Sequence, residues 1–180
     1  MPKKYKVIYT HRTQGEEPES IHIKSIVDAL VELGCEVEIV APVKGEPGRV
    51  GPNAGLLSKI KKSAPPFVFE LLQIGYNLVT YRKMARAIDA TKPDFVYERY
   101  ALYNFGAILA AKRRGVKVIL EVNTAYASAW AKYFKVYFQG FATRIEDYIF
   151  SRADAIITVT KELREKLRDG GVAFRIEVMH

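Results

Sequence analysis

Short apolar runs and helical repeats of apolar residues follow one another along the whole chain. The short runs are rich in valine, isoleucine and tyrosine, and polar or glycine-containing segments separate them, which is typical of buried strands. The pattern predicts strands over residues 6–10, 36–41, 94–98, 116–121, 155–159 and 175–178.

Between these runs, apolar residues recur at helical spacing. Gly34 closes the first helical segment, as glycine often does just past the end of a helix. The apolar face of that segment consists of Ile23, Ile26, Val27, Leu30 and Leu33. The further helical segments are predicted over 66–90, 102–114, 129–152 and 161–168. In 66–90 the residues expected to face inward are Val68, Leu71, Leu72, Leu78 and Val79.

This alternation of strands and helices predicts the fold class. Consecutive parallel strands need a crossover connection, and a helix usually supplies it. We therefore expect an α/β domain with a doubly wound, mostly parallel sheet of the Rossmann-like kind. In such sheets the ligand lies outside the carboxyl ends of the strands, which here means the loops after Thr10, Ala41, Glu98 and Glu121.

The common nucleotide motifs of such sheets are missing from the sequence. A dinucleotide site needs G-x-G-x-x-G after the first strand, but the first loop contains only Gly15, and the second strand ends in Ala41 and Pro42 rather than in an acid. No G-x-x-x-x-G-K-[ST] segment occurs. The first loop does open a helix, whose amino terminus favours anions, but the Glu residues of that turn also stabilise a helix end without any ligand.

Composition narrows the class of protein further. The 180 residues are 49% hydrophobic and 27% charged, which is ordinary for a globular domain. The lone Cys35 excludes an internal disulfide and makes a cysteine-based metal site improbable. No apolar stretch approaches the roughly 18 residues of a membrane span, and we expect a cytosolic protein. The net charge of +8 favours an anionic partner, namely nucleic acid, a phosphorylated small molecule or an acidic membrane, although excess lysines also simply keep domains soluble.

Two segments combine basic and aromatic residues. They are "SKIKKSAPPFVFELLQIGYNLVTYRKMARAI" and "WAKYFKVYFQGFATRIEDYIF". Such a mixture suits stacking on single-stranded nucleic acid, or an interfacial helix on an anionic membrane. The same aromatic residues also serve as ordinary core, and the segments alone do not decide among the three.

Three longer segments carry a resemblance to a known family. "ESIHIKSIVDALVELGCEVEIVAP", "PDFVYERYALYNFGAILAAKRRGVKVILEVNTAYA" and "SRADAIITVTKELREKLRDGGV" resemble, in this order and spacing, the amino-terminal domain of GT-B glycosyltransferases of the group 1, or family 4, type. The most specific parts are "YER", "LEVN" and "ADAIITVTKELREKL". The resemblance covers nearly all of the chain and implies that residues 1–180 are one Rossmann-like acceptor-side domain.

The resemblance also implies an activity. Such enzymes transfer a sugar from a nucleotide-sugar donor, generally with retention of configuration and without a metal or other cofactor. Their carboxyl-terminal domain holds the donor through a Glu-x7-Glu segment, which this sequence lacks. We therefore expect the donor-binding domain to be absent from this chain, and the chain alone to be inactive. Its acceptor is expected to be a saccharide or a lipid-linked molecule. We expect the protein to contact an anionic membrane peripherally and not to bind nucleic acid.

The substrate-binding residues implied by the family lie in the first loop and after the fourth strand. They are Thr13, Gln14, Gly15 and Asn123. Many relatives have two small residues in that loop and a histidine in place of Asn123, whereas a subset shows a Glu-x-Asn arrangement like Glu121 and Asn123. An asparagine can hydrogen-bond a sugar hydroxyl but cannot transfer a proton. No catalytic residue is nominated.

Four further candidates come from their places at strand ends. Glu121 is two residues from Asn123, so both side chains are expected on the same side of the sheet, bound either to substrate or to the scaffold. Glu98 and Arg99 end the neighbouring strand and are expected to form an ion pair. His11 directly follows the first strand and is better placed than His22, although a lone histidine in a loop often has no role. The alternative to an enzyme is a free-standing, non-catalytic module that binds a sugar, a nucleotide or a protein.

Overall fold

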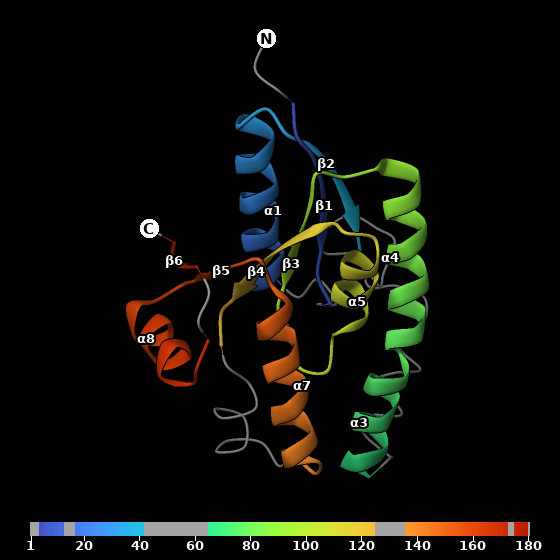
Figure 1. Ribbon diagram of the computed structural model, residues 1–180, viewed down its shortest axis with the longest axis vertical. Helices are drawn as coiled ribbons and strands as arrows, with labels where there is room; N and C mark the ends of the chain where they lie inside the picture. Colours follow the sequence, from blue (N-terminus) through green and yellow to red (C-terminus); the bar gives the residue numbers. More distant parts are fainter. Residues whose placement is uncertain (1–3, 13–16, 42–64, 125–135, 173–174, 180) are drawn as a thin grey trace.

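A parallel sheet of six strands organises the domain (Figure 1). The computed structural model describes residues 4–12, 17–41, 65–124, 136–172 and 175–179. The strands are β1 (Lys6–Thr10), β2 (Glu36–Val40), β3 (Phe95–Arg99), β4 (Lys117–Val122), β5 (Ala155–Thr158) and β6 (Ile176–Val178). Their order is β2-β1-β3-β4-β5-β6, and every neighbouring pair is parallel. The predicted fold class is confirmed, and the strand order reverses direction at β1, which places the ligand crevice beside the carboxyl ends of β1 and β3.

Helices cover both faces of this sheet. They are α1 (Glu17–Glu32), α3 (Pro66–Gly75), α4 (Asn77–Thr91), α5 (Gly106–Arg113), α7 (Gln139–Arg152) and α8 (Lys161–Asp169). On one face α1 packs its Ile23 against Val7, Tyr9 and Tyr97. The opposite face carries the larger core, in which α4, α5 and α7 pack against Ile8, Val96 and Leu120. Each such fully buried aliphatic side chain contributes about 1.5–3 kcal/mol.

The predicted helix over 66–90 is divided at Tyr76 into α3 and α4. The reason is the Asn77 side chain, whose Nδ2 donates to the carbonyls of Ile74 and, from another part of the chain, Tyr103, at 3.0 and 2.6 Å. A side chain that engages helical carbonyls in this way interrupts the regular ladder. The same Asn77 offers its Oδ1 to the backbone N–H groups of Phe105 and Gly106 at 2.9 and 2.7 Å, so α5 begins at Gly106 rather than at residue 102.

Gly106 is needed for this contact between α4 and α5. A Cβ added there would lie 2.6 Å from the Asn77 carbonyl oxygen, which no side chain tolerates. Gly34 likewise has a positive φ of 83° one residue beyond Leu33, as predicted for the end of α1. Leu33 itself was expected to face inward, but it is 80% exposed because it lies past the end of α1.

The predicted inward face of 66–90 is also wrong in part. Leu71, Leu72, Leu78 and Val79 are exposed, and the buried side chains of these helices are Glu70, Asn77, Met84, Ala85 and Ile88. Glu70 is buried because its carboxylate accepts hydrogen bonds from the N–H groups of Tyr137 and Phe138 and from the Tyr103 hydroxyl, at 2.7, 3.1 and 2.9 Å. These N–H groups belong to the two residues before α7. Of the helix predicted over 129–152, residues 136–138 are not helical, α7 begins at Gln139, and residues 129–135 lie outside the described ranges.

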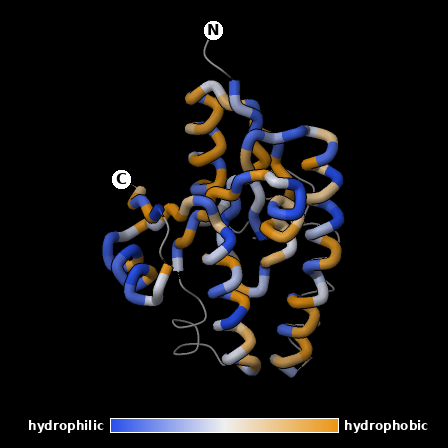
Figure 2. Tube along the Cα trace, viewed as in Figure 1, coloured by the Kyte–Doolittle hydropathy of each residue, from blue (hydrophilic) through white to orange (hydrophobic). Residues whose placement is uncertain are grey.

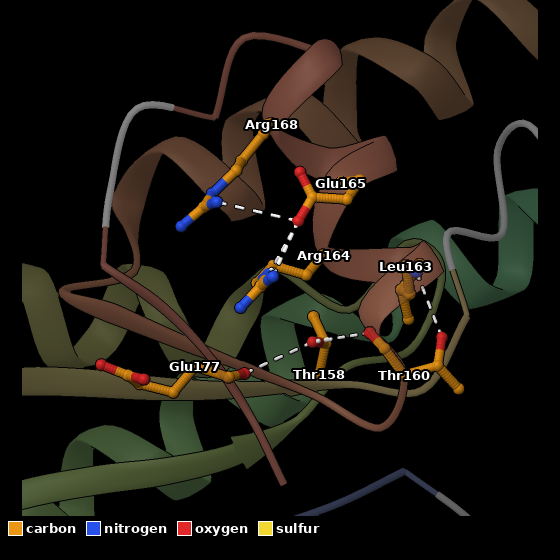
Figure 3. A network of polar contacts seen from close by, with 7 residues as sticks. All are labelled: Thr158, Thr160, Leu163, Arg164, Glu165, Arg168 and Glu177. Carbon is orange, nitrogen blue, oxygen red and sulfur yellow. Dashed lines mark hydrogen bonds and ion pairs between the residues drawn. The ribbon is translucent and has the colours of Figure 1, made fainter.

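The last unit of the fold, β5-α8-β6, is held by threonine side chains (Figure 3). Thr160 caps α8 by accepting a hydrogen bond from the Leu163 N–H at 3.1 Å. The hydroxyl of Thr158 reaches the carbonyls of Thr160 and Glu177 at 3.2 and 3.3 Å, which joins the end of β5 to β6. Glu165 lies between Arg164 and Arg168 on the surface of α8. These exposed pairs contribute little to stability.

Candidate functional site

Polar side chains surround a buried carboxylate at the carboxyl ends of β3 and β4. Glu121 is fully buried, and its Oε1 lies 2.8 Å from His22 Nε2 and accepts from Asn123 Nδ2 at 3.0 Å. The Tyr97 hydroxyl donates to Oε2 at 3.1 Å, and Arg99 Nε lies 3.9 Å from Oε1. We call His22, Tyr97, Arg99, Glu121 and Asn123 the Glu121 cluster.

Strand geometry explains most of this cluster. Residues two apart on a strand project to the same face, and β3 is registered on β4 with Arg99 beside Glu121. Tyr97 and Arg99 therefore share the α1 face with Glu121 and Asn123. The predicted common side of Glu121 and Asn123 is confirmed by their hydrogen bond.

Aromatic rings extend the cluster toward β1. The ring of Tyr9 stacks on that of Tyr97 at 5.4 Å between centroids, and His11 lies 6.1 Å from Tyr9. Burial, followed by the charge of Glu121, raises the pKa of both tyrosines far above the usual value. Both phenols therefore keep their protons at neutral pH. The Tyr9 hydroxyl is buried and has no hydrogen-bond partner among the described residues.

Glu98 lies on the opposite face of the sheet. Its Oε1 accepts a hydrogen bond from Asn104 Nδ2 at 2.9 Å, while Oε2 is buried without a partner among the described residues. Burial raises the pKa of Glu98 to about 8. The predicted ion pair between Glu98 and Arg99 is wrong, because adjacent strand residues point to opposite faces, and Arg99 lies beside Glu121 instead.

A small hollow opens on the Glu98 side, at the carboxyl ends of β1 and β2. It is shallow and open to solvent. It is lined by Thr10, His11, Arg12, Val40, Ala41, Tyr76, Thr80, Lys83 and Asn104. We call it the Arg12 hollow. His11 thus lies where the crevice was predicted, between Tyr9 and this hollow, whereas Thr13, Gln14 and Gly15 lie outside the described residues.

The sequence interpretation missed two residues that matter here. His22 was ranked below His11, although it lies four residues before Ile26 and therefore on the inward stripe of α1, a signal that could have identified it. Nothing in the sequence singles out Arg12, because its contacts come from α3 and α4, which follow it by more than fifty residues. In the ranges that the structure describes, no three His, Cys, Asp or Glu side chains lie close enough together to hold a metal ion.

The fold and this edge define a class: a doubly wound α/β domain with its polar site outside the strand ends. Within that class, the chain belongs to glycosyltransferase family 4, whose model matches residues 20–180. The family predicted from the sequence motifs is thereby confirmed. A search of the curated proteins finds no match.

Solved structures show the same fold at low sequence identity. The UDP-GlcNAc 2-epimerase from Neisseria meningitidis bound to UDP-GlcNAc has a TM-score of 0.60 at 14% identity, over 96% of this chain and 45% of its own. UGT2 from Phytolacca americana, complexed with UDP-2fluoro-glucose and pterostilbene, has a TM-score of 0.59 at 9% identity, over 98% and 54%. MurG from Acinetobacter baumannii has a TM-score of 0.50 at 17% identity, over 88% and 41%. The chain thus spans about half the length of these proteins.

Proposed function

We propose that this is the acceptor-binding domain of a glycosyltransferase. The enzyme moves a sugar from a nucleotide-sugar donor to a saccharide or lipid-linked acceptor with retention of configuration. Membership of family 4 supports the reaction class. Two of the similar structures hold UDP-GlcNAc and UDP-2fluoro-glucose, which supports a nucleotide-sugar as donor. The chain spans about half the length of those proteins, and our proposal assigns donor binding to a second domain.

The observation that carries the acceptor role is the fixed amide of Asn123. Its Nδ2 is held by the fully buried Glu121, while its Oδ1 has no hydrogen-bond partner among the described residues. This Oδ1 is buried, and a buried acceptor atom without a partner is costly, so a donor that reaches it at the carboxyl edge of the sheet would relieve that cost. A sugar hydroxyl, which must be positioned for attack, is the natural donor to that oxygen.

In this mechanism the domain described here positions the acceptor, and the second domain stabilises the charge that develops during transfer. Negative charge develops on the departing diphosphate, and preorganised cations or N–H donors lower its energy. His22, Tyr97 and Arg99 act through Glu121 by holding its carboxylate, so they are positioning residues. The buried rings of Tyr9 and Tyr97 keep water from that side of the carboxylate.

The test compares the 180-residue chain with the full product of its gene. Both are offered UDP-glucose and UDP-N-acetylglucosamine with a membrane lipid extract and a panel of saccharides, and products are detected by mass spectrometry. We expect transfer by the gene product and none by the chain alone. Asn123→Ala should lower kcat/KM by about tenfold or more, the loss of one well-placed hydrogen bond. Arg175→Gln changes an exposed residue directly before β6. It is the control and should leave kcat/KM unchanged.

Two outcomes would contradict the proposal. A gene product that ends with this chain and binds sugars without turnover would favour the non-catalytic binding module. Full activity in the Asn123→Ala enzyme would remove the acceptor role from Asn123, whatever the reaction.

We also infer that this domain works in the cytosol and makes peripheral contact with an anionic membrane. Figure 2 colours much of α3 and the beginning of α7 as hydrophobic, and the ring of Phe67 on α3 lies 5.8 Å from that of Tyr137, just before α7. This apolar patch consists of Phe67, Leu71, Leu72, Tyr137, Phe138 and Phe141, all of them at least 36% exposed. The net charge of +8 would add attraction to acidic headgroups. In the described part of the chain, no helix has the length and hydrophobicity to cross a bilayer.

Vesicle flotation tests this contact. We expect the chain to float with phosphatidylglycerol vesicles more than with phosphatidylcholine vesicles, and Leu71→Asp to reduce flotation several-fold, because a charge in the patch must be desolvated at the interface. Leu33→Asp makes the same change at a leucine beyond α1 that is more exposed than Leu71, 80% against 51%, and is the control. Equal losses in both variants would assign binding to net charge alone.

A further inference from the structure

The Arg12 hollow lies apart from the Glu121 cluster, on the α4 side of the sheet. Thr10 and Arg12 come from the end of β1, Val40 and Ala41 from the end of β2, and Thr80 and Lys83 from α4. Thr10 is registered beside Glu98 on β3, so the floor of the hollow shares its face with Glu98 rather than with Glu121. Asn104, which holds Glu98, completes the wall.

Arg12 is fixed in this hollow with hydrogen-bonding capacity left over. Its Nη2 donates to the Gln73 carbonyl at 2.9 Å, and its guanidinium carbon lies 5.4 Å from the centre of the Tyr76 ring. Its Nη1 is buried and has no hydrogen-bond partner among the described residues. A buried, charged donor without a partner is costly, and an incoming oxygen acceptor would relieve that cost.

The charge around Arg12 suits an anion. Lys83 supplies a second cation, and none of the described residues that line the hollow is acidic. The carboxyl group behind Asn104 does not cancel this charge, because burial raises the pKa of Glu98 to about 8 and keeps it largely protonated at neutral pH. Arginine and lysine together form the common recognition set for phosphate oxygens.

We propose that the Arg12 hollow binds a phosphate group, and that this phosphate belongs to the acceptor. The first half stands on the geometry of the hollow alone. The second half rests on the proposed function: an acceptor with a phosphate in the Arg12 hollow and a hydroxyl beside Asn123 would cross the carboxyl edge between β1 and β3. The acceptor class is then a phosphorylated saccharide or a phospholipid-linked one.

Isothermal titration of the 180-residue chain with inorganic phosphate, glucose 6-phosphate and UDP tests the assignment. We expect inorganic phosphate and glucose 6-phosphate to bind, and to protect the chain against thermal unfolding. Arg12→Gln should weaken both by about tenfold or more, since a charge-assisted hydrogen bond is lost. Arg175→Gln removes the same charge from an exposed position on the far edge of the sheet and should change neither.

A second variant covers the case in which Arg12→Gln unfolds, because Arg12 also bonds to α3. Lys83→Gln leaves the Gln73 contact intact and should still weaken phosphate binding several-fold. The assignment is overturned if no phosphate binds, or if folded Arg12→Gln and Lys83→Gln bind it as the parent chain does. Binding of UDP without glucose 6-phosphate would assign the hollow to the donor and overturn the acceptor half.

The two proposals can fail separately. Phosphate binding that depends on Arg12, with no sugar transfer by the full gene product, would keep the hollow and refute the proposed function. Sugar transfer to acceptors that lack phosphate, with kcat/KM unchanged in Lys83→Gln, would keep the reaction and refute the acceptor half of the inference.

Discussion

Two glutamates at the same edge of the sheet are equally buried and differently surrounded. Glu121 and Glu98 both have no exposed surface, and both lie near the ends of neighbouring strands. Around Glu121 the structure places the His22 ring, the Tyr97 hydroxyl, the Asn123 amide and, farther off, the Arg99 guanidinium. Among the described residues, Glu98 has the single amide of Asn104 as a hydrogen-bond partner.

The difference shows that burial alone does not decide what a carboxyl group does. Donors that replace water stabilise a buried negative charge, and their absence favours the protonated form. Glu121 is held by several side chains at once and orients Asn123 and His22. Glu98, whose pKa is raised to about 8, is a neutral polar group on the face that carries the Arg12 hollow.

Replacing Glu121 should have the largest effect. Glu121→Leu removes the acceptor for three buried or half-buried donors and also the carboxylate beside Arg99, a kind of change that costs about 3–5 kcal/mol. The free energy of unfolding, measured by urea titration with circular dichroism, should fall by that amount or the chain should fail to fold. Glu177→Leu, at an exposed position on β6, is the control. A loss of less than about 1 kcal/mol in Glu121→Leu, within the range of one ordinary hydrogen bond, would show that its donors find other partners.

Replacing Glu98 should have a smaller effect, and one that depends on pH. Folding raises the pKa of Glu98 from 4.5 to about 8, so between those values the folded state holds a proton that the unfolded chain releases. Stability from this group is thus fully present below about pH 4.5 and falls as pH rises toward 8, by up to about 1.4 kcal/mol per pH unit. Glu98→Gln cannot ionise and lacks this loss.

The measurement is the free energy of unfolding of both proteins at pH 5 and at pH 7. Between pH 5 and pH 7 the free energy of unfolding of the variant should rise by about 2 kcal/mol relative to that of the parent chain. An equal pH dependence in both proteins would mean that Glu98 is already ionised in the folded state, and the contrast with Glu121 would disappear.

Particular residues show how far the sequence predicted this arrangement. The side shared by Glu121 and Asn123 followed from the period of a strand, and the end of α1 at Gly34 followed from glycine's tolerance of positive φ. Both are local properties. The ion pair expected of Glu98 and Arg99 failed on the same local rule, since neighbours on a strand cannot share a face.

The remaining errors concern contacts between distant segments. Asn77 divides the helix over 66–90 because its side chain reaches Tyr103. Glu70 is buried because it accepts hydrogen bonds from the residues just before α7, and the apolar Leu71 and Leu72 face outward. His22 and Arg12 likewise acquire partners from β4 and α3. Helical periodicity in one segment does not reveal which polar side chain the rest of the fold will bury.

The smallest expected effect is a difference in stability between two variants of stacked tyrosines, Tyr97→Phe and Tyr9→Phe. Tyr97 and Tyr9 stack on each other and are both buried, but only the Tyr97 hydroxyl donates to Glu121, whereas that of Tyr9 has no partner in the described part of the chain. Tyr97→Phe should therefore lower the free energy of unfolding by about 0.5–1.5 kcal/mol, the net value of one hydrogen bond. Tyr9→Phe removes an unsatisfied hydroxyl and should leave stability unchanged or slightly raised. The two variants remove the same atom from neighbouring rings, so burial and stacking cancel in their difference. If both lost the same free energy, the hydroxyl of Tyr9 would have a partner too, and the carboxylate of Glu121 would be less dependent on Tyr97 than its geometry implies.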